Sequence, residues 1–89
     1  MSINLDSKRE TLTRTADQIE LVLWYDEAIN IDSQIKSLID ICKISEQESI
    51  NIALDSLLDG SAKITTGNYD RLIKLQEAFQ KKLINTTIE

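Results

Sequence analysis

The chain has 89 residues with 10 basic and 15 acidic side chains, a net charge of −5, which predicts one small domain without the positive charge of a general nucleic-acid binder. It has no histidine and one cysteine, Cys42, so the usual general base, an internal disulfide and a conventional zinc site are excluded. No glycine-rich phosphate loop is present either. We therefore expect a binding protein and not an enzyme, with no cofactor and no bound metal.

The longest uninterrupted apolar run, Leu21 to Tyr25, is far too short for a membrane span, and no secretion signal is recognisable. Together with the single cysteine, this predicts a cytoplasmic protein. Carboxylates are paired at Asp26/Glu27 and at Glu46/Glu48, a pattern that is common on solvated helix faces. These pairs therefore do not by themselves indicate a site.

The first 31 residues permit two interpretations. Two capping-box spacings, Ser7 with Glu10 and Thr15 with Gln18, favour a helix. Alternating apolar residues between Ile19 and Tyr25, rich in β-branched and aromatic types, favour a strand instead. An apolar run of this length does not decide between helix and strand by its periodicity, so both remain open.

Residues 32–43 predict an amphipathic helix whose start is capped by Asp32 or Ser33. Its apolar face consists of Ile35, Leu38, Ile39 and Cys42. Since Cys42 lies on this face, we expect it to be a small buried residue and not a reactive thiol.

Residues 45–60 predict a second helix, separated from the first by a very short turn. Ser45 and Glu48 form a capping box at its start, and Gly60 marks its end. The apolar residues repeat at helical spacing and predict one buried stripe, made of Ile50, Ala53, Leu54, Leu57 and Leu58.

Residues 61–67 are expected to form a loop anchored by Ile64, and residues 68–83 a third helix capped by Asn68. The apolar stripe of this helix consists of Tyr69, Leu72, Ile73, Phe79 and Leu83. The last residues, 85–89, are expected to fray.

These elements predict a mainly α fold: a helical pair plus a C-terminal helix. Ile35, Leu38 and Cys42, followed by Ser45, Glu48, Ile50, Ala53 and Leu54, resemble the paired helices of ribbon-helix-helix regulators of the Arc/CopG kind. The resemblance covers about residues 20–83. It divides the single domain, 1–89, into an N-terminal segment (1–18), a ribbon-helix-helix core (19–60) and a loop with the C-terminal helix (61–89).

The resemblance implies a homodimer with one short strand per chain, and a DNA-binding regulator or antitoxin. The residues implied at the dimer interface are Leu21, Leu23, Trp24 and Tyr25. The residues implied to contact DNA are Lys8, Arg9, Arg14, Ser45, Glu46 and Gln47. The third helix looks like the toxin-binding segment of antitoxins that pair with acetyltransferase toxins, and it implies a protein partner held by Tyr69, Leu72, Ile73 and Phe79.

The alternative comes from another class of protein. If residues 7–29 form a long helix, the chain is an all-α helical bundle that acts as an adaptor or inhibitor. Such a protein would bind a protein partner, such as a nucleic-acid enzyme with a basic surface, without binding DNA itself. The segment from Leu21 to Tyr25 separates the two hypotheses, because a strand favours the regulator and a helix favours the bundle.

Overall fold

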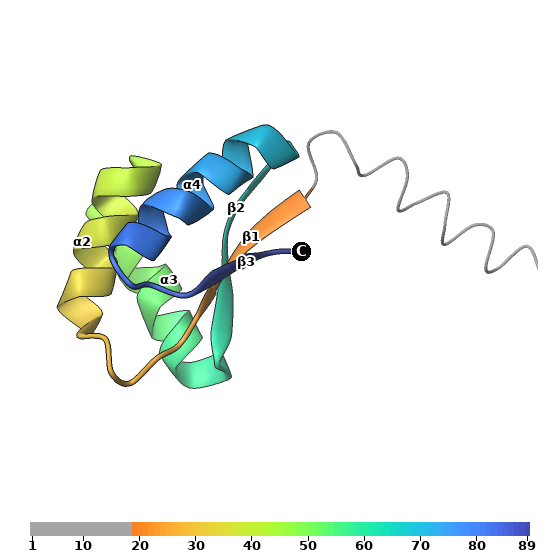
Figure 1. The fold of residues 1–89 in the computed structure, drawn as a ribbon. Coiled ribbons are helices and arrows are strands. Elements are labelled where there is room, and N and C mark those ends of the chain that lie inside the picture. Colours follow the sequence, from red (N-terminus) through yellow and green to blue (C-terminus); the bar gives the residue numbers. More distant parts are fainter. Residues whose placement is uncertain (1–18) are drawn as a thin grey trace, which may run out of the picture.

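The computed structural model describes residues 19–89, which form a three-stranded antiparallel sheet and three helices (Figure 1). The elements in chain order are β1 (Ile19–Trp24), α2 (Ile31–Cys42), α3 (Glu46–Asp59), β2 (Ser61–Gly67), α4 (Tyr69–Lys81) and β3 (Thr86–Ile88). The mainly α prediction, whether as a ribbon-helix-helix dimer or as an all-α bundle, is therefore wrong. The fold combines α and β structure, and the proposed capping boxes before residue 19 lie outside the described residues.

The strand interpretation of residues 19–24 is the one that the structure adopts, but the strand pairs within its own chain. β1 is the central strand of the sheet, in the order β2-β1-β3. Val22, for example, lies opposite Lys63 of β2 on one side and Thr87 of β3 on the other. Because both edges of β1 are already paired, the strand does not need a second chain, and the structural reason for a ribbon dimer is removed.

Two segments expected to be irregular are strands. Residues 61–67, expected to be a loop, form β2, and the C-terminal residues expected to fray form β3. The ends of the β1–β3 pair are closed by backbone hydrogen bonds, from Trp24 N to Asn85 O at 3.0 Å and from Glu20 N to Glu89 O at 2.8 Å. Both strands are mostly polar edge strands, so their apolar periodicity is weak and their pairing partners are distant in sequence.

The helix ends agree closely with the capping patterns. Ser45 Oγ accepts a hydrogen bond of 3.1 Å from Glu48 N at the start of α3. Gly60 ends that helix with a φ of 92°, a backbone conformation that glycine adopts without a steric cost. Helix α2 differs from the prediction, since its cap is Asn30, whose Oδ1 accepts from Asp32 N at 2.7 Å.

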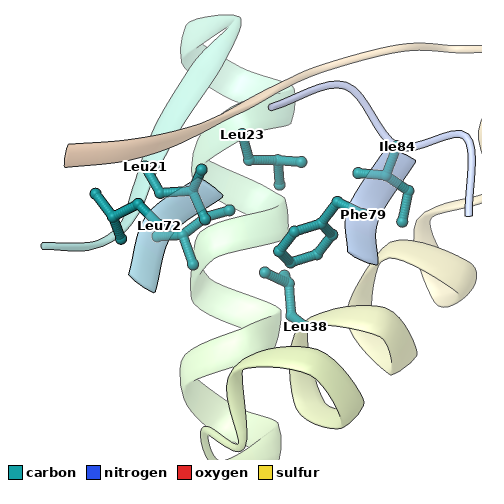
Figure 2. Close-up of a cluster of buried hydrophobic side chains, with 7 residues drawn as sticks. Leu21, Leu23, Leu38, Leu72, Phe79 and Ile84 are labelled. Atoms are coloured by element: carbon teal, nitrogen blue, oxygen red, sulfur yellow. The ribbon is translucent and has the colours of Figure 1, made fainter. Parts of the chain in front are cut away.

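The core lies between the sheet and the three helices, which pack on the same side of the sheet (Figure 1). Figure 2 shows Leu23 of β1 pointing toward Phe79 of α4, with Leu38 of α2 beyond it. Leu21 of β1 lies beside Leu72 of α4. The buried cluster consists of Leu21, Leu23, Leu38, Ile64, Leu72, Phe79 and Ile84. A register shift of β2 opposite Leu21 and Val22 leaves Ile64 unpaired in the ladder, with its side chain in this core.

The face of α3 that packs on the core is not the predicted one. Its buried residues are Ser49, Ala53 and Ser56, and of the predicted stripe only Ala53 is buried. The two serines can be buried because each hydroxyl donates to a carbonyl of its own helix, at 2.9 Å for Ser49 and 2.8 Å for Ser56. Small side chains let α3 approach the sheet closely, and the leucines are left outside.

Candidate functional site

The loop between β1 and α2, residues 25–30, is held in place by its own hydrogen bonds. The amide of Ala28 donates a hydrogen bond of 2.9 Å to Asp26 Oδ1. The amide of Ile29 donates one of 3.0 Å to the backbone carbonyl oxygen of Asp26. The amide of Tyr25 donates to the carbonyl oxygen of Gly60 at 2.9 Å, which ties the loop to the end of α3. The loop is thus a defined piece of structure beside the C-terminal half of α3.

A pocket of about 390 Å³ lies between this loop, the start of α2 and α3. We call it the loop pocket, and it is lined by Tyr25, Glu27, Ile29, Asn30, Ile31, Asp32 and Leu57. A second pocket, of about 450 Å³, adjoins it, since Asn30 and Asp32 line both. The volume of the loop pocket is that of a site for one amino-acid side chain or a small organic molecule.

The lining of the loop pocket combines two kinds of chemistry. Glu27 and Asp32 supply carboxylates, and no lysine or arginine is among the lining residues. The remaining lining is mainly apolar, with Ile29, Ile31 and Leu57 beside the aromatic ring of Tyr25. Such a pocket suits a ligand that carries a positive charge next to an apolar group.

Residues 19–89 were compared with the requirements of a metal site and of a membrane-spanning helix. Within this range no group of three His, Cys, Asp or Glu side chains could hold a metal ion. None of the helices described here is both long and apolar enough to cross a membrane.

Of the residues predicted to contact DNA, the structure describes only the three at the start of α3, Ser45, Glu46 and Gln47. Lys8, Arg9 and Arg14 lie outside the described residues. At the start of α3, Ser45 is occupied as the cap, and the exposed carboxylates of the first turn, Glu46 among them, disfavour a phosphate. The side-chain amide of Gln47 donates a hydrogen bond of 3.0 Å to Asn51 Oδ1 of the same helix.

The residues predicted at a dimer interface divide into two groups. Leu21 and Leu23 are fully buried in the core of the single chain and are unavailable to a second copy. Trp24 and Tyr25 are more exposed, at 38% and 39%. Trp24 Nε1 donates to Thr87 Oγ1 at 2.7 Å, so the indole lies against β3 of its own chain.

The predicted partner-binding stripe of α4 is divided between the core and the surface. Leu72 and Phe79 are fully buried in the core, while Tyr69 is 53% exposed and Ile73 is partly buried. Two of its four residues, Leu72 and Phe79, are thus taken up by the core of the chain itself. Binding of a partner by Tyr69 and Ile73 stays a prediction.

Sequence analysis missed the loop pocket. Paired carboxylates such as Asp26/Glu27 are typical of a solvated helix face, but here they lie in the turn directly after β1. Asn30 and Asp32 were not connected with Leu57 because these residues are far apart in the sequence. Acidic residues directly after an apolar strand were the one local signal of this site.

The sequence matches no protein-family model, and no curated protein matches it. In fold, however, it is similar to Agrobacterium tumefaciens ClpS2, a structure solved in complex with L-phenylalaninamide. The TM-score is 0.74, the two chains are 18% identical, and the match covers 80% of this chain and 93% of ClpS2. The chain has a ClpS-like fold. This likeness overturns the ribbon-helix-helix resemblance and the DNA-binding regulator or antitoxin function that was drawn from it.

Proposed function

We propose that the chain is a ClpS-like adaptor, a non-enzymatic protein that holds the N-terminal residue of a protein substrate and delivers that substrate to a Clp-type protease in the cytoplasm. The loop pocket is the proposed site for the N-terminal residue. Of the two hypotheses from the sequence, the alternative, protein binding without DNA, is closer to this proposal, although its all-α bundle is not the observed fold.

The chemistry of the ClpS2 ligand supports the proposal. L-phenylalaninamide has a free α-amine, an apolar side chain, and an amide in place of its carboxylate. It is therefore equivalent to the first residue of a peptide, whose amine is positively charged near neutral pH. The observation that carries the proposal is that the loop pocket of this ClpS-like fold places two carboxylates beside apolar side chains.

The proposed arrangement assigns a role to each kind of lining residue. Glu27 and Asp32 pair with the ammonium group, since hydrogen bonds between charged groups are stronger than neutral ones. Ile29, Ile31 and Leu57 exclude water from an apolar side chain. Acetylation of the amine removes the positive charge, so it is expected to prevent binding.

Fluorescence anisotropy tests the proposal with a peptide that begins with phenylalanine and carries fluorescein at its C-terminus. We expect the free-amine peptide to bind and the same peptide with an acetylated N-terminus to bind at least tenfold more weakly. Glu27→Gln, which removes one pocket carboxylate, is expected to weaken binding of the free-amine peptide at least tenfold. Glu77→Gln, an exposed carboxylate of α4 outside the pocket, is the matched control and should leave binding unchanged. Equal binding of the free and acetylated peptides, or no binding of either, would contradict the proposed function.

A further inference from the structure

Helix α3 presents leucines to solvent where a small protein would normally present polar residues. Leu54 and Leu57 are each 43% exposed and Leu58 is 80% exposed. Residues three and four apart lie on the same face of a helix, so these three form one continuous surface, which we call the α3 leucine face. Contiguous exposed apolar surface of this kind marks interaction sites in monomeric proteins.

Folding does not explain the α3 leucine face. The core side of α3 is built from Ser49, Ala53 and Ser56, and it already packs against the sheet. The leucines lie on the remaining surface of the helix, and Leu58 in particular contributes little buried apolar surface to the fold. A partner that covers these side chains would remove apolar surface from water, which is the main favourable term in association.

The charge around the α3 leucine face restricts the kind of partner. The helix carries four exposed carboxylates and no basic residue; the acids are Glu46, Glu48, Asp55 and Asp59. Asp55 and Asp59 each follow a leucine of the face by one position, so they lie on the adjoining strip of the helix surface. The apolar surface therefore has an acidic border.

We propose that the α3 leucine face docks a basic amphipathic helix of a partner protein. The apolar stripe of that helix would pack along Leu54 and Leu58, and its flanking lysines or arginines would meet Asp55 and Asp59. A second copy of this chain is a poorer occupant, because pairing two α3 helices would bring eight like charges, four from each copy, into one interface. Opposite charge makes a basic helix the better fit.

This inference goes beyond the proposed function and, apart from Leu57, uses different residues. Leu57 lines the loop pocket, so the two surfaces adjoin, but Leu54, Leu58, Asp55 and Asp59 do not line the pocket. Substitutions at these four positions therefore test the α3 leucine face without removing a pocket residue.

The experiment uses the full chain and a designed 18-residue probe peptide labelled with fluorescein. Leucines at helical spacing form one face of the probe, and lysines form the rest. We expect the probe to bind wild-type protein, and Leu54→Ser/Leu58→Ser to weaken binding at least tenfold. Leu83→Ser, at a leucine that is 78% exposed elsewhere on the surface, is the matched control and should change affinity less than twofold. Asp55→Asn/Asp59→Asn should weaken binding and reduce its dependence on salt.

Several results would overturn the inference. The inference is wrong if the lysine probe does not bind, or if a probe with glutamates in place of lysines binds with the same affinity. It is also wrong if Leu83→Ser loses as much affinity as Leu54→Ser/Leu58→Ser. Light scattering that shows a wild-type dimer converted to a monomer by Leu54→Ser/Leu58→Ser would assign the face to a second copy instead. The N-terminal phenylalanine peptide, measured on the same variants, should bind unchanged, which separates failure at the leucine face from failure at the loop pocket.

Discussion

The amide of Tyr25 donates a hydrogen bond of 2.9 Å to the carbonyl oxygen of Gly60, and this bond joins the loop after β1 to the end of α3. Tyr25 and Leu57 both line the loop pocket although they are far apart in the sequence, and this bond holds their two segments together. Gly60 also turns the chain from α3 into β2 through its positive φ. One tight connection thus positions the pocket, the exposed helix and the sheet relative to one another.

The observed packing of α3 predicts a large difference between two leucine substitutions. Leu38 is fully buried, so Leu38→Ala should lower the free energy of unfolding by about 2–5 kcal/mol through lost burial and a cavity. Leu54 is 43% exposed, so Leu54→Ala should lower it by less than about 1 kcal/mol. Urea denaturation of both variants measures the two changes. Equal losses would mean that the leucines of α3 are buried after all, as the sequence pattern alone had indicated.

The turn after α4 predicts a stabilising substitution. Leu83 has a φ of 63°, and the amides of Leu83 and Ile84 donate to the carbonyl oxygens of Gln80 and Phe79 at 2.9 and 3.0 Å, the pattern of a Schellman motif. Leucine is strained in this conformation and glycine is not. Leu83→Gly should therefore raise the free energy of unfolding by about 1 kcal/mol in urea denaturation. Leu83→Ala keeps the strain and is the control, so a similar gain in that variant would show that strain is not the cause.

A buried amide in α2 predicts a second gain. Gln34 is 1% exposed, and its Oε1 is buried with no hydrogen-bond partner among residues 19–89. Gln34→Met keeps a similar volume and removes this unpaired acceptor, so it should leave stability unchanged or raise it by up to about 1 kcal/mol. Gln34→Glu introduces a carboxyl group at the same place and should destabilise by about 2 kcal/mol or more. Thermal unfolding at neutral pH compares the two variants, and a loss in Gln34→Met as large as that in Gln34→Glu would refute this account.

The thiol of Cys42 predicts a pH dependence of stability. Burial raises the pKa of Cys42 from its ordinary value of 9.0 to about 11, while the positive charge of Arg71 acts in the opposite direction. Between these two values the unfolded chain loses the thiol proton and the folded chain keeps it, so the free energy of unfolding falls as the pH rises. Below pH 9 the contribution is fully present.

The measurement is urea denaturation from pH 8 to pH 11 for wild type and Cys42→Ala. All other side chains are the same in both proteins, so the difference between them isolates the thiol. We expect wild type to lose stability relative to Cys42→Ala as the pH rises through this range. A constant difference would show that Cys42 ionises equally in the folded and unfolded chain.

The sequence by itself determined where the three helices of residues 19–89 lie and how α3 and α4 begin. As predicted, α3 begins after Ser45 and ends at Gly60, and α4 begins after Asn68. The sequence predicts these ends because a cap satisfies backbone groups that lie only a few residues away. The lack of histidine and the single cysteine also restricted the chemistry without any knowledge of the fold. These properties are local or compositional, so no distant contact changes them.

Only the tertiary structure decided the sheet, the pocket and the inner face of α3. The strand between Ile19 and Trp24 takes its partners from residues 61–67 and 86–88, and backbone pairing over such distances leaves little trace in local periodicity. Helix α3 has two possible faces at helical spacing, one of small residues and one of leucines, and the space above the sheet admits the small one. Hydrophobicity ranked the leucines first because it measures transfer from water, whereas packing also depends on how closely a helix can approach its neighbours.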